Sequence, residues 1–505
     1  MLKPAFIFTD HAILQCQMPV YIWGESDAKI VTVSFNGISV SSSVENGKFM
    51  CELPPMEPNI RSELVFESEN EKITLNDVIT GEVWLASGQS NMEHPVFCTE
   101  YDADALCDDP DIRLFTVPRL TFYKGDTYGF HFDSLHSVDT PWKRCTVKEA
   151  LHFTAIGYFF AHKLKNKLNI PVGIISCNWG ATPVESWTRE EYLLRDRLAR
   201  RATDKKRAEI EAAGLDNLIS RYEKYQSELK EFCLSYDAEA ITREKGVAWY
   251  LRHAGDGQPP LPMDISFYRF PSALRENMLE RIVPYSFRGV IWHQGESNTS
   301  TEVDSKEHYM ANYRALMADW RDAFKNPEMP FYLVQIAGVA WHGDGADYWQ
   351  GVRDAQEALM NEEKNVYMTV SYDLSEPDNI HPAKKQPMGE RLAAAALANT
   401  YGHDIRWRCP TVSSVAVEEN MLVLHCADAT EWHTSDGSEI EGFYFVDKDG
   451  KRERASVCAN GSKLICQIPE NANAEYIEYS RLNYSYTNLS NEDSLPLTPF
   501  KINIS

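Results

Sequence analysis

The middle of the chain, residues 81–405, alternates between short apolar runs and amphipathic helical stretches. The apolar runs are VWLASG, PVGIISCNW, RGVIWH, PFYLVQIA and VYMTVSY, and helical patterns such as HYMANYRALMADWRDAF and GERLAAAALAN lie between and after them. Continuous apolar strands separated by helices are typical of a parallel sheet that is covered on both faces. We therefore predict an α/β fold with a doubly wound parallel sheet, which binds ligands at the carboxyl ends of its strands.

Both ends of the chain show strand and turn patterns without a helical period. Residues 1–80 contain the β-rich runs VYIWGE, KIVTVSFNG, FMCELP and SELVFE, with a hairpin signal at Asn46-Gly47. We predict a small β-sandwich domain there. Residues 406–505 contain MLVLHCA, EGFYFVDKDG and KLICQI, with further Asp-Gly and Asn-Gly turns. They predict a C-terminal β-rich domain or extension.

A charged stretch at about 190–260 interrupts the predicted sheet domain. It includes RDRLARRATDKKRAEIEAAG and ISRYEKYQSELKEF, whose charges are typical of solvated helical faces. We predict a helical insertion, and a lid over a ligand site is the alternative interpretation.

The chain is acidic, since 50 Lys and Arg against 74 Asp and Glu give a formal net charge of −24. Such a surface repels phosphate backbones and anionic lipid headgroups. We therefore predict neither nucleic acid nor a membrane as a partner. An anionic small substrate is still compatible with the sequence, because a few well-placed arginines suffice to bind it. Nothing in the sequence indicates an oligomeric state.

The 11 cysteines are an odd number without a C-x-x-C pair, and several lie in apolar runs. Free, buried thiols in a reducing compartment are the expectation. The first residues, MLKPAFIFTDHAILQ, lack the long apolar core and the cleavage site of a signal peptide, and no run is long enough to span a membrane. We predict a cytoplasmic location, with a processed secreted form as the alternative.

The segment GEVWLASGQSNME, residues 81–93, leads a strand into Gly88 and then into Ser90. A nucleophilic serine is exposed on a sharp strand-to-helix turn, where its own backbone N–H helps to hold an oxyanion. Gly88 permits the turn, and a helix N-terminus after it favours developing negative charge. The competing interpretation is that Ser90 or Asn91 merely caps a helix.

The segment GIISCNWGATPVESW, residues 173–187, ends an apolar strand at Trp179 and Gly180. A glycine at this place lets its backbone N–H approach a substrate closely, as an oxyanion donor must. For this segment alone, an ordinary glycine in a strand-to-helix turn is the alternative.

The segment RGVIWHQGESN, residues 288–298, places Gln294, Gly295, Glu296 and Asn298 directly after an apolar strand. Asn298 is a candidate side-chain donor to an oxyanion. Glu296 is a candidate to hold an imidazole or to fix the loop, and Gln294 is a supporting candidate. A capped helix start is the alternative, but the place at the predicted ligand-binding edge favours a function.

The segment SYDLSEPDNIHPAKKQPMGERLA, residues 371–393, places Asp378 three residues before His381. On a tight loop stiffened by Pro377 and Pro382, a carboxylate can orient the imidazole through one nitrogen while the other faces the serine. His381 is also a candidate metal ligand. Since no second cluster in the sequence has the spacing of metal ligands, we predict no metal site.

All four segments follow strands of the one predicted sheet. A serine, two oxyanion donors, a histidine and an acid then meet at one edge, which is far harder to obtain by chance than any single member. The combination predicts acyl transfer, with His381 as the base for Ser90. The N–H groups of Ser90 and Gly180 and the amide of Asn298 are the predicted oxyanion hole.

The chain resembles the sialate O-acetylesterase family, a group of carbohydrate esterases within the SGNH hydrolases. Those enzymes share four blocks that carry serine, glycine, asparagine and histidine. The matching runs are GQSNM with Ser90, NWGATPVESW with Gly180, WHQGESN with Gly295 and Asn298, and DNIHP with Asp378 and His381. The likeness extends over nearly the whole chain, and includes TDHAILQCQMPVYIWGE near its start and SNEDSLPLTPF near its end.

The resemblance implies an SGNH hydrolase domain over residues 81–405 that removes acetyl groups from O-acetylated sugars, sialic acids included, without cofactor or metal. Two positions depart from the family pattern: Ala181 replaces a second glycine, and His293 replaces a more usual aromatic residue. Related families differ over which acid supports the histidine, so Glu296 is a rival to Asp378.

Three other functions fit the same sequence. A xylan, mannan or xyloglucan acetylesterase differs only in the sugar. A lipid or thioester hydrolase on this fold would need room for a longer acyl chain. A carbohydrate-binding protein without activity would use the β-rich flanks, but it leaves the four blocks unexplained.

Overall fold

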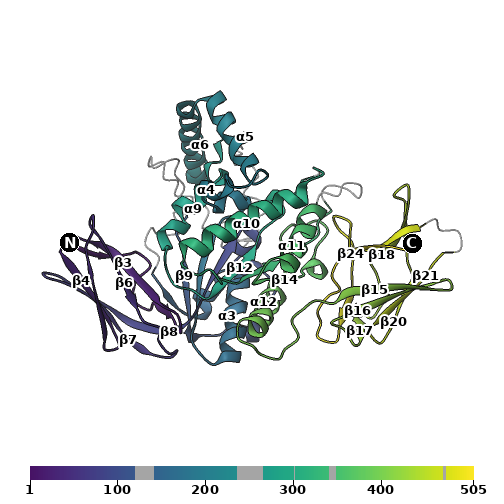
Figure 1. The fold of residues 1–505 in the computed structure, drawn as a ribbon, viewed down its shortest axis with the longest axis horizontal. Helices are drawn as coiled ribbons and strands as arrows, with labels where there is room; N and C mark the ends of the chain where they lie inside the picture. The colour runs from purple at the N-terminus through teal and green to yellow at the C-terminus, as the bar shows by residue number, and fades with distance from the viewer. Residues whose placement is uncertain (120–140, 236–264, 301, 341–348, 470–473, 505) are drawn as a thin grey trace.

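The computed structural model describes residues 1–119, 141–235, 265–300, 302–340, 349–469 and 474–504. Figure 1 shows a central body of helices and strands with a β-rich region on either side. The two ends of the chain lie on opposite sides of that body. The mixed α/β architecture expected from the sequence is confirmed.

The central body is built on strands that run parallel to one another. In order across the sheet, they are β9 (Asp109–Thr116), β11 (Val172–Asn178), β8 (Lys72–Gly88), β12 (Gly289–His293), β13 (Phe331–Val334) and β14 (Val366–Thr369). A short strand, β10 (Lys143–Cys145), pairs antiparallel with β9. Because β8 lies between β11 and β12, its carboxyl end lies near the middle of the sheet edge.

Helices cover both faces of this sheet (Figure 1). On one face α3 (Ala155–Leu168) packs against α12 (Gln386–Asn399), and on the other α10 (Ser305–Ala323) packs against α11 (Gln350–Glu362). Trp84 and Ala86 of β8 join the core of α3 and α12, whereas Val83 and Leu85 join the core of α10 and α11. Successive side chains of a strand point to opposite faces, so β8 is apolar throughout this part.

The N-terminal region consists of short strands. One sheet contains β1 (Leu2–Pro4), β3 (Val20–Ser26) and β6 (Lys48–Leu53), and a second group contains β2 (Ile13–Gln15), β4 (Ile30–Phe35), β5 (Ile38–Ser43) and β7 (Arg61–Ser68). The first part of β8 pairs with β7 and β2, and its last part pairs with β11 and β12. One strand of 17 residues therefore runs through both regions, and the predicted domain boundary at residue 80 falls inside it.

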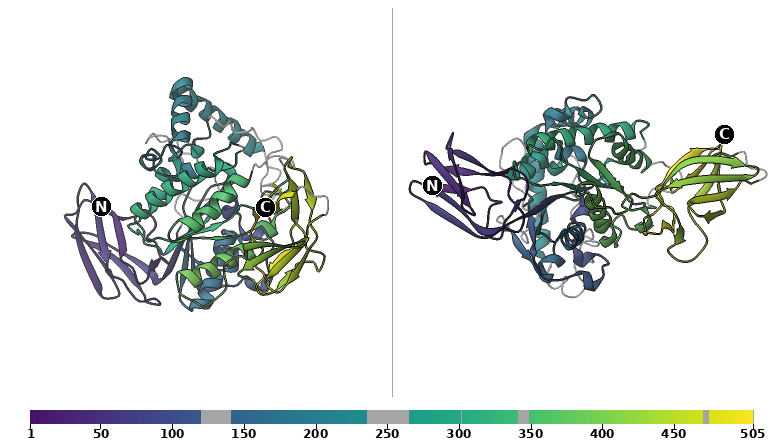
Figure 2. Two further views of the ribbon diagram at one scale, coloured as in Figure 1. Left: turned by 45° about the vertical axis from the view of Figure 1, so that its right-hand side comes forward. Right: turned by 60° about the horizontal axis from the view of Figure 1, so that its bottom comes forward.

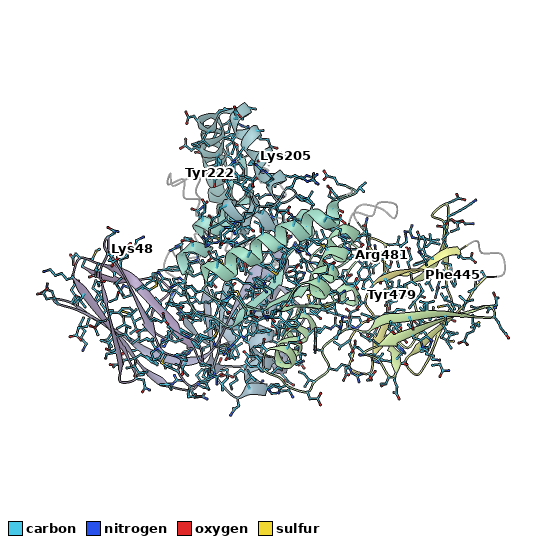
Figure 3. All side chains as sticks on the ribbon, in the orientation of Figure 1. Lys48, Lys205, Tyr222, Phe445, Tyr479 and Arg481 are labelled. Atoms are coloured by element: carbon cyan, nitrogen blue, oxygen red, sulfur yellow. The ribbon has the colours of Figure 1, made fainter. Side chains whose placement is uncertain are left out.

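The charged insertion is helical where the structure describes it. Helix α4 (Glu190–Leu193) packs against α10, and helices α5 (Arg200–Ala213) and α6 (Leu215–Ser235) project from the body at the top of Figure 1. Lys205 and Tyr222 mark this projection in Figure 3. The rest of the predicted insertion, residues 236–260, lies outside the described residues. A short helix, α9 (Ala273–Asn277), returns the chain to the body.

The C-terminal region is made of strands, as Figure 2 shows from two further sides. One sheet contains β15 (Thr411–Glu418), β16 (Met421–Ala427), β20 (Val457–Asn460) and β21 (Lys463–Gln467). A second sheet contains β18 (Phe443–Asp447), β19 (Arg452–Arg454), β22 (Ala474–Tyr479) and β24 (Phe500–Asn503). In a third, β17 (Trp432–Thr434) pairs with β23 (Leu489–Asn491). Phe445 and Tyr479 belong to its core. Arg481, labelled in Figure 3, forms an ion pair with Asp354 of α11 and joins this region to the body.

Two features of the described residues bear on the cellular setting. No helix among them is both long and apolar enough to cross a bilayer. The cysteines among them are all free, and most are buried.

Candidate active site

The junction of β8 and α1 (Ser90–Glu93) presents Ser90 at the carboxyl end of the central strand. Gly88 has a φ of +138°, and an added Cβ would overlap the carbonyl oxygen of His293, so a glycine is required at this point. The next residue, Gln89, donates its backbone N–H to the same carbonyl at 3.0 Å. The chain is thus locked to β12 immediately before the serine.

Ser90 and His381 lie within hydrogen-bond distance of each other. The Oγ of Ser90 is 2.8 Å from Nε2 of His381. His381 is on the loop between η8 (Tyr372–Leu374) and α12. Burial lowers the pKa of His381 to about 4, and the positive charge of Lys385 acts in the same direction. The imidazole is therefore neutral near pH 7 and able to accept the serine proton.

The two predicted supporting acids occupy different surroundings. Asp378 is exposed, while Glu296 is buried and accepts a hydrogen bond from Nδ2 of Asn91 at 2.5 Å. Within the described part of the chain, neither carboxylate is hydrogen-bonded to His381. A third carboxylate, Glu376, accepts bonds from the N–H of Ala383 at 2.6 Å and from the Asn379 amide at 3.1 Å. Glu376 thus closes the loop that carries His381.

Two of the predicted oxyanion donors, Gly180 and Asn298, are hydrogen-bonded to carboxylates. Gly180 follows β11, and a Cβ added to it would lie 3.2 Å from the Cβ of Ser90. Its N–H donates to the carboxylate of Glu93 at 2.6 Å. Asn298, at the end of η7 (Glu296–Asn298), donates through Nδ2 to Glu185 at 2.9 Å. The Gly180 donor is therefore occupied in this state, whereas the Asn298 amide has a second N–H.

Gln294 connects the third segment to the second. Its Nε2 donates to Oδ1 of Asn298 at 2.5 Å and to the carbonyl of Thr182 at 3.2 Å. Tyr309 of α10 donates to its Oε1 at 3.2 Å. Gln294 therefore fixes the orientation of the Asn298 amide rather than facing Ser90 itself.

Ala181, one of the two departures noted in the sequence, has a φ of +57°. This left-handed conformation is the one in which glycine is favoured and alanine is strained. The geometry gives the physical reason why a glycine suits the position.

Comparison with protein families matches residues 80–232 and 266–398, more than half of the chain, to the family described as carbohydrate esterase, sialic acid-specific acetylesterase. The chain belongs to this family. Ser90, Gly180, Asn298 and His381 all lie within the matched ranges. The resemblance to the sialate O-acetylesterases that the sequence showed is confirmed, and with it membership of an esterase family.

Two curated relatives and one solved structure show how far the likeness to this esterase family extends. The human sialate O-acetylesterase is 25% identical over 390 residues, which cover 72% of this chain and 62% of the human protein. The Rattus norvegicus sialate O-acetylesterase is 27% identical over 388 residues, which cover 70% and 64%. The chain thus spans less than two thirds of the length of these relatives. A carbohydrate acetylesterase from Xanthomonas citri matches over the whole of both chains, with a TM-score of 0.76 and 23% identity, and shares the fold.

Several residues at this candidate site were not predicted from the sequence. Asn91 and Lys385 form a buried pair, with Nζ of Lys385 donating to Oδ1 of Asn91. Glu93 bonds to Gly180 and also forms an ion pair with Arg119 at 2.6 Å. Asn91 and Glu93 stand in the same short segment as Ser90, which is a signal that the sequence offered. Nothing in the sequence marks Lys385 as buried, because lysine is almost never fully buried.

An aromatic pair lies next to Gly180. The rings of Trp179 and Tyr268 are stacked, with centroids 4.9 Å apart and an interplanar angle of 9°. The guanidinium of Arg119 is 5.8 Å from the centroid of the Trp179 ring. Aromatic faces and a cation next to Gly180 are compatible with a polar, sugar-sized substrate.

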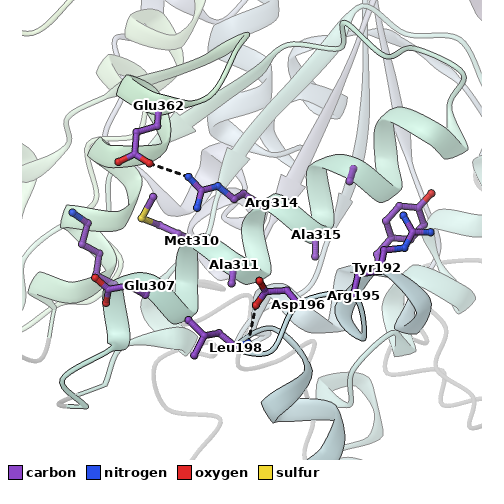
Figure 4. A pocket seen from close by; sticks show the side chains of 12 residues that line it. Tyr192, Arg195, Asp196, Leu198, Glu307, Met310, Ala311, Arg314, Ala315 and Glu362 are labelled. Atoms are coloured by element: carbon purple, nitrogen blue, oxygen red, sulfur yellow. Dashed lines mark hydrogen bonds and ion pairs between the residues drawn. The ribbon is translucent and has the colours of Figure 1, made fainter.

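A surface pocket of about 570 Å³ lies on the outer side of α10, and its lining does not include Ser90 or His381. Figure 4 shows its walls, with Tyr192 and Leu198 from the insertion and Met310 and Arg314 from α10. Arg314 is already paired with Glu362 there. Among the residues that the structure covers, no group of three or more His, Cys, Asp and Glu is arranged to hold a metal ion.

Proposed function

We propose that this protein is a carbohydrate O-acetylesterase that hydrolyses acetyl esters on sugars, with O-acetylated sialic acid as the favoured substrate. The observation that carries the proposal is the 2.8 Å contact between Ser90 Oγ and His381 Nε2 at the end of the central strand. Membership of the sialic acid-specific acetylesterase family supports the substrate class. The names of the curated relatives agree with it.

The proposed reaction is acyl transfer in two steps. His381 takes the Ser90 proton as Oγ attacks the acetyl carbonyl, and the sugar oxygen leaves with the proton from His381. Water then attacks the acetyl-serine, with His381 again as the base, and acetate is released. The N–H groups of Ser90 and Gly180 and the Asn298 amide are the proposed oxyanion donors. For Gly180 to serve, the Glu93 carboxylate must first leave its N–H, because both occupy the same donor.

The sequence pattern names Asp378 as the supporting acid of the proposed triad, with Glu296 as its rival. Asp378 follows from the sequence pattern, but its exposed carboxylate does not reach His381 in the present geometry. Glu296 acts on the site through Asn91. Substitution of each acid, described in the Discussion, separates the two.

The architecture proposed with this function is a doubly wound SGNH hydrolase domain over residues 81–405, with β-rich domains at 1–80 and 406–505. The parallel order of β9, β11, β8, β12, β13 and β14, with helices on both faces, supports it. The free thiols support the proposed cytoplasmic location.

The decisive experiment is acetate release from a panel of O-acetylated sialosides, xylan, mannan and xyloglucan, with Ser90→Ala protein as the control. We expect release from the sialosides and a loss of roughly 10⁶-fold in kcat in Ser90→Ala, as for the serine of other triads. Release only from a plant polysaccharide would replace the substrate and keep the mechanism. Near-normal turnover by Ser90→Ala would reject the mechanism, and binding of the glycans without acetate release would identify a carbohydrate-binding protein.

A further inference from the structure

The side chain of Asn91 links the serine turn to the histidine loop. Asn91 directly follows Ser90, and its side chain is buried, with 1% of the residue exposed. Its Nδ2 donates to the carbonyl of Ile380, the residue before His381, at 3.1 Å. The same nitrogen donates to Oε1 of Glu296 at 2.5 Å. One amide therefore joins the neighbours of both reacting side chains to the loop after β12.

Lys385, which follows His381 in the sequence, provides the remaining contact of the Asn91 amide. Its residue is fully buried, and its ammonium donates to Oδ1 of Asn91. An ammonium only donates, whereas a carboxylate and a carbonyl only accept. The three partners therefore fix one orientation of the Asn91 amide, and no other side chain of the same size can satisfy all of them.

Titratable groups next to His381 come from more than one element. His94, at the end of α1, has its ring centroid 4.6 Å from that of His381. Burial lowers the pKa of His381 most, and the positive charge of Lys385 lowers it further. Burial lowers the pKa of Lys385 itself to about 7, against the opposing effect of Glu296 and Glu376. Below pH 7 the ammonium is therefore charged beside the imidazole.

We propose that Asn91 is a positioning residue that holds Ser90 and His381 at their reacting distance, and that Lys385 fixes the Asn91 amide and supplies a positive charge behind the imidazole. This inference rests on the proposed acyl-transfer function. In other triads a carboxylate bonded to the imidazole positions the histidine. Here the network of Asn91, Lys385 and Glu296 takes over part of that positioning.

The first test measures hydrolysis of 4-nitrophenyl acetate by Asn91→Leu and Asn91→Asp. Leucine bonds to none of the three partners, and aspartate faces the carboxylate of Glu296 and the carbonyl of Ile380 with oxygens that cannot donate. We expect kcat to fall by roughly 100-fold in both, the scale of a misplacement of about 1 Å, with KM nearly unchanged. An unchanged kcat would overturn the proposal.

The matched control is Asn491→Leu. Asn491 is also fully buried and makes hydrogen bonds to Asp428, Asp493 and Leu495, but it lies in the C-terminal region. Its substitution should lower the thermal midpoint without changing kcat of the folded enzyme. If Asn491→Leu reduces kcat as much as Asn91→Leu does, the effect is general destabilisation and the positioning role is rejected.

The second test separates the hydrogen bond of Lys385 from its charge. Lys385→Gln keeps a donor for Asn91 and loses the charge, whereas Lys385→Met loses both. Without the positive charge the pKa of His381 rises, although burial still holds it below the ordinary value of ~6.5, so the acid limb of kcat/KM should move to higher pH in both variants. Only Lys385→Met should also lose kcat. The role of Lys385 would be overturned if the acid limb of the kcat/KM profile keeps its pH position, or if Lys385→Met keeps its full kcat.

The outcomes distinguish this inference from the proposed function. If Ser90→Ala still hydrolyses the ester, the proposed function itself is wrong. If Ser90→Ala is inactive while Asn91→Leu keeps its kcat, the function stands and the positioning role alone fails.

Discussion

At the scale of single residues, two groups proposed as oxyanion donors are hydrogen-bonded to neighbouring carboxylates. Ser90 and His381 contact each other, but Gly180 and Asn298 give hydrogen bonds to Glu93 and Glu185. Catalytic hydrogen bonds are often incomplete in a free enzyme and tighten when substrate binds. If Gly180 and Asn298 are the oxyanion donors, as proposed, the two glutamates hold them in place, and a carbonyl oxygen must displace Glu93 from the Gly180 N–H.

The supporting acid is decided by Asp378→Asn and Glu296→Gln, measured side by side. A direct triad role predicts a loss of about 10⁴-fold in kcat, as when the carboxylate behind a triad histidine becomes an amide. Because Asp378 is exposed and makes no bond to His381, we expect less than a roughly tenfold loss for Asp378→Asn. Glu296→Gln should lose more, since a neutral amide oxygen is a weaker acceptor for Nδ2 of Asn91 and the negative charge that faces Lys385 is lost. A larger loss in Asp378→Asn would restore Asp378 as the acid.

The strained alanine beside the site gives a prediction about stability. Ala181 has a φ of +57°, which costs an L-residue roughly 1–2 kcal/mol and glycine little. After the extra backbone entropy of glycine, Ala181→Gly should raise the free energy of unfolding by about 0.5–1 kcal/mol, seen as a higher urea midpoint. The control is Ala318→Gly in the exposed face of α10, where glycine should lower the midpoint. A lower midpoint for Ala181→Gly would contradict the strain.

At the scale of elements, the site depends on the junction between β8 and α1. Gly88 ends the strand with a φ of +138°, at a point where a side chain would enter the carbonyl of His293. The main chain of β12 therefore dictates how β8 turns toward Ser90.

Gly88→Ala should consequently remove activity and destabilise the fold by about 3 kcal/mol, because both the backbone strain and the overlap act together. Gly402→Ala is the control, since Gly402 also has a positive φ of +71° but no atom within 4 Å of an added Cβ. It should cost about 1 kcal/mol and leave turnover unchanged. Equal effects of the two substitutions, measured by thermal unfolding and acetate release, would show that the overlap with His293 is unimportant.

The regular elements were the part of the fold that the sequence predicted well. The runs VWLASG, PVGIISCNW and RGVIWH became β8, β11 and β12, because both faces of these strands are buried. Strand β9 was not predicted, since Asp111 and Arg113 interrupt its apolar pattern. The structure buries Arg113 completely, with Asp77 at 3.0 Å, a pairing between distant segments that no local pattern encodes.

The sequence predicted only the part of the site that depends on where the strands end. Ser90 and His381 meet because their segments leave the same edge of the sheet. The orientation of the Asp378 side chain and the burial of Lys385 depend on an irregular loop. A hydrogen bond from the N–H of Ala383 to Glu376 closes that loop. Such tertiary contacts are set by three-dimensional neighbours, so the D-x-x-H spacing could not reveal them.

At the scale of the whole molecule, the C-terminal region is held to the body by two guanidinium groups, and that of Arg353 is buried. Arg353 of α11 is 1% exposed and donates to the carbonyls of Leu482 at 3.0 Å and Asn483 at 3.3 Å. Arg481, from the C-terminal region, forms an ion pair with Asp354 of α11. The contact between the two parts thus relies on charge-assisted bonds to α11.

Arg353→Met should weaken this contact by about 2–4 kcal/mol, because the carbonyls lose their donors inside the protein. Limited proteolysis should then cut the C-terminal region faster than in the unaltered protein. Arg314→Met is the control, since Arg314 is 43% exposed and its ion pairs with Glu362 and Glu363 contribute little. Equal proteolysis rates for Arg353→Met and the unaltered protein would contradict the role of Arg353.

The passage of β8 through two sheets has a consequence for local opening. Its ladder continues from Lys72, beside β7, to Gly88, two residues before Ser90. Amide protons along such a ladder exchange with solvent only when the neighbouring strands separate, and a strand shared by two sheets couples their opening. The N-terminal strands and the serine turn should therefore form one cooperative unit, in which slow exchange near Ser90 is maintained by strands more distant in sequence.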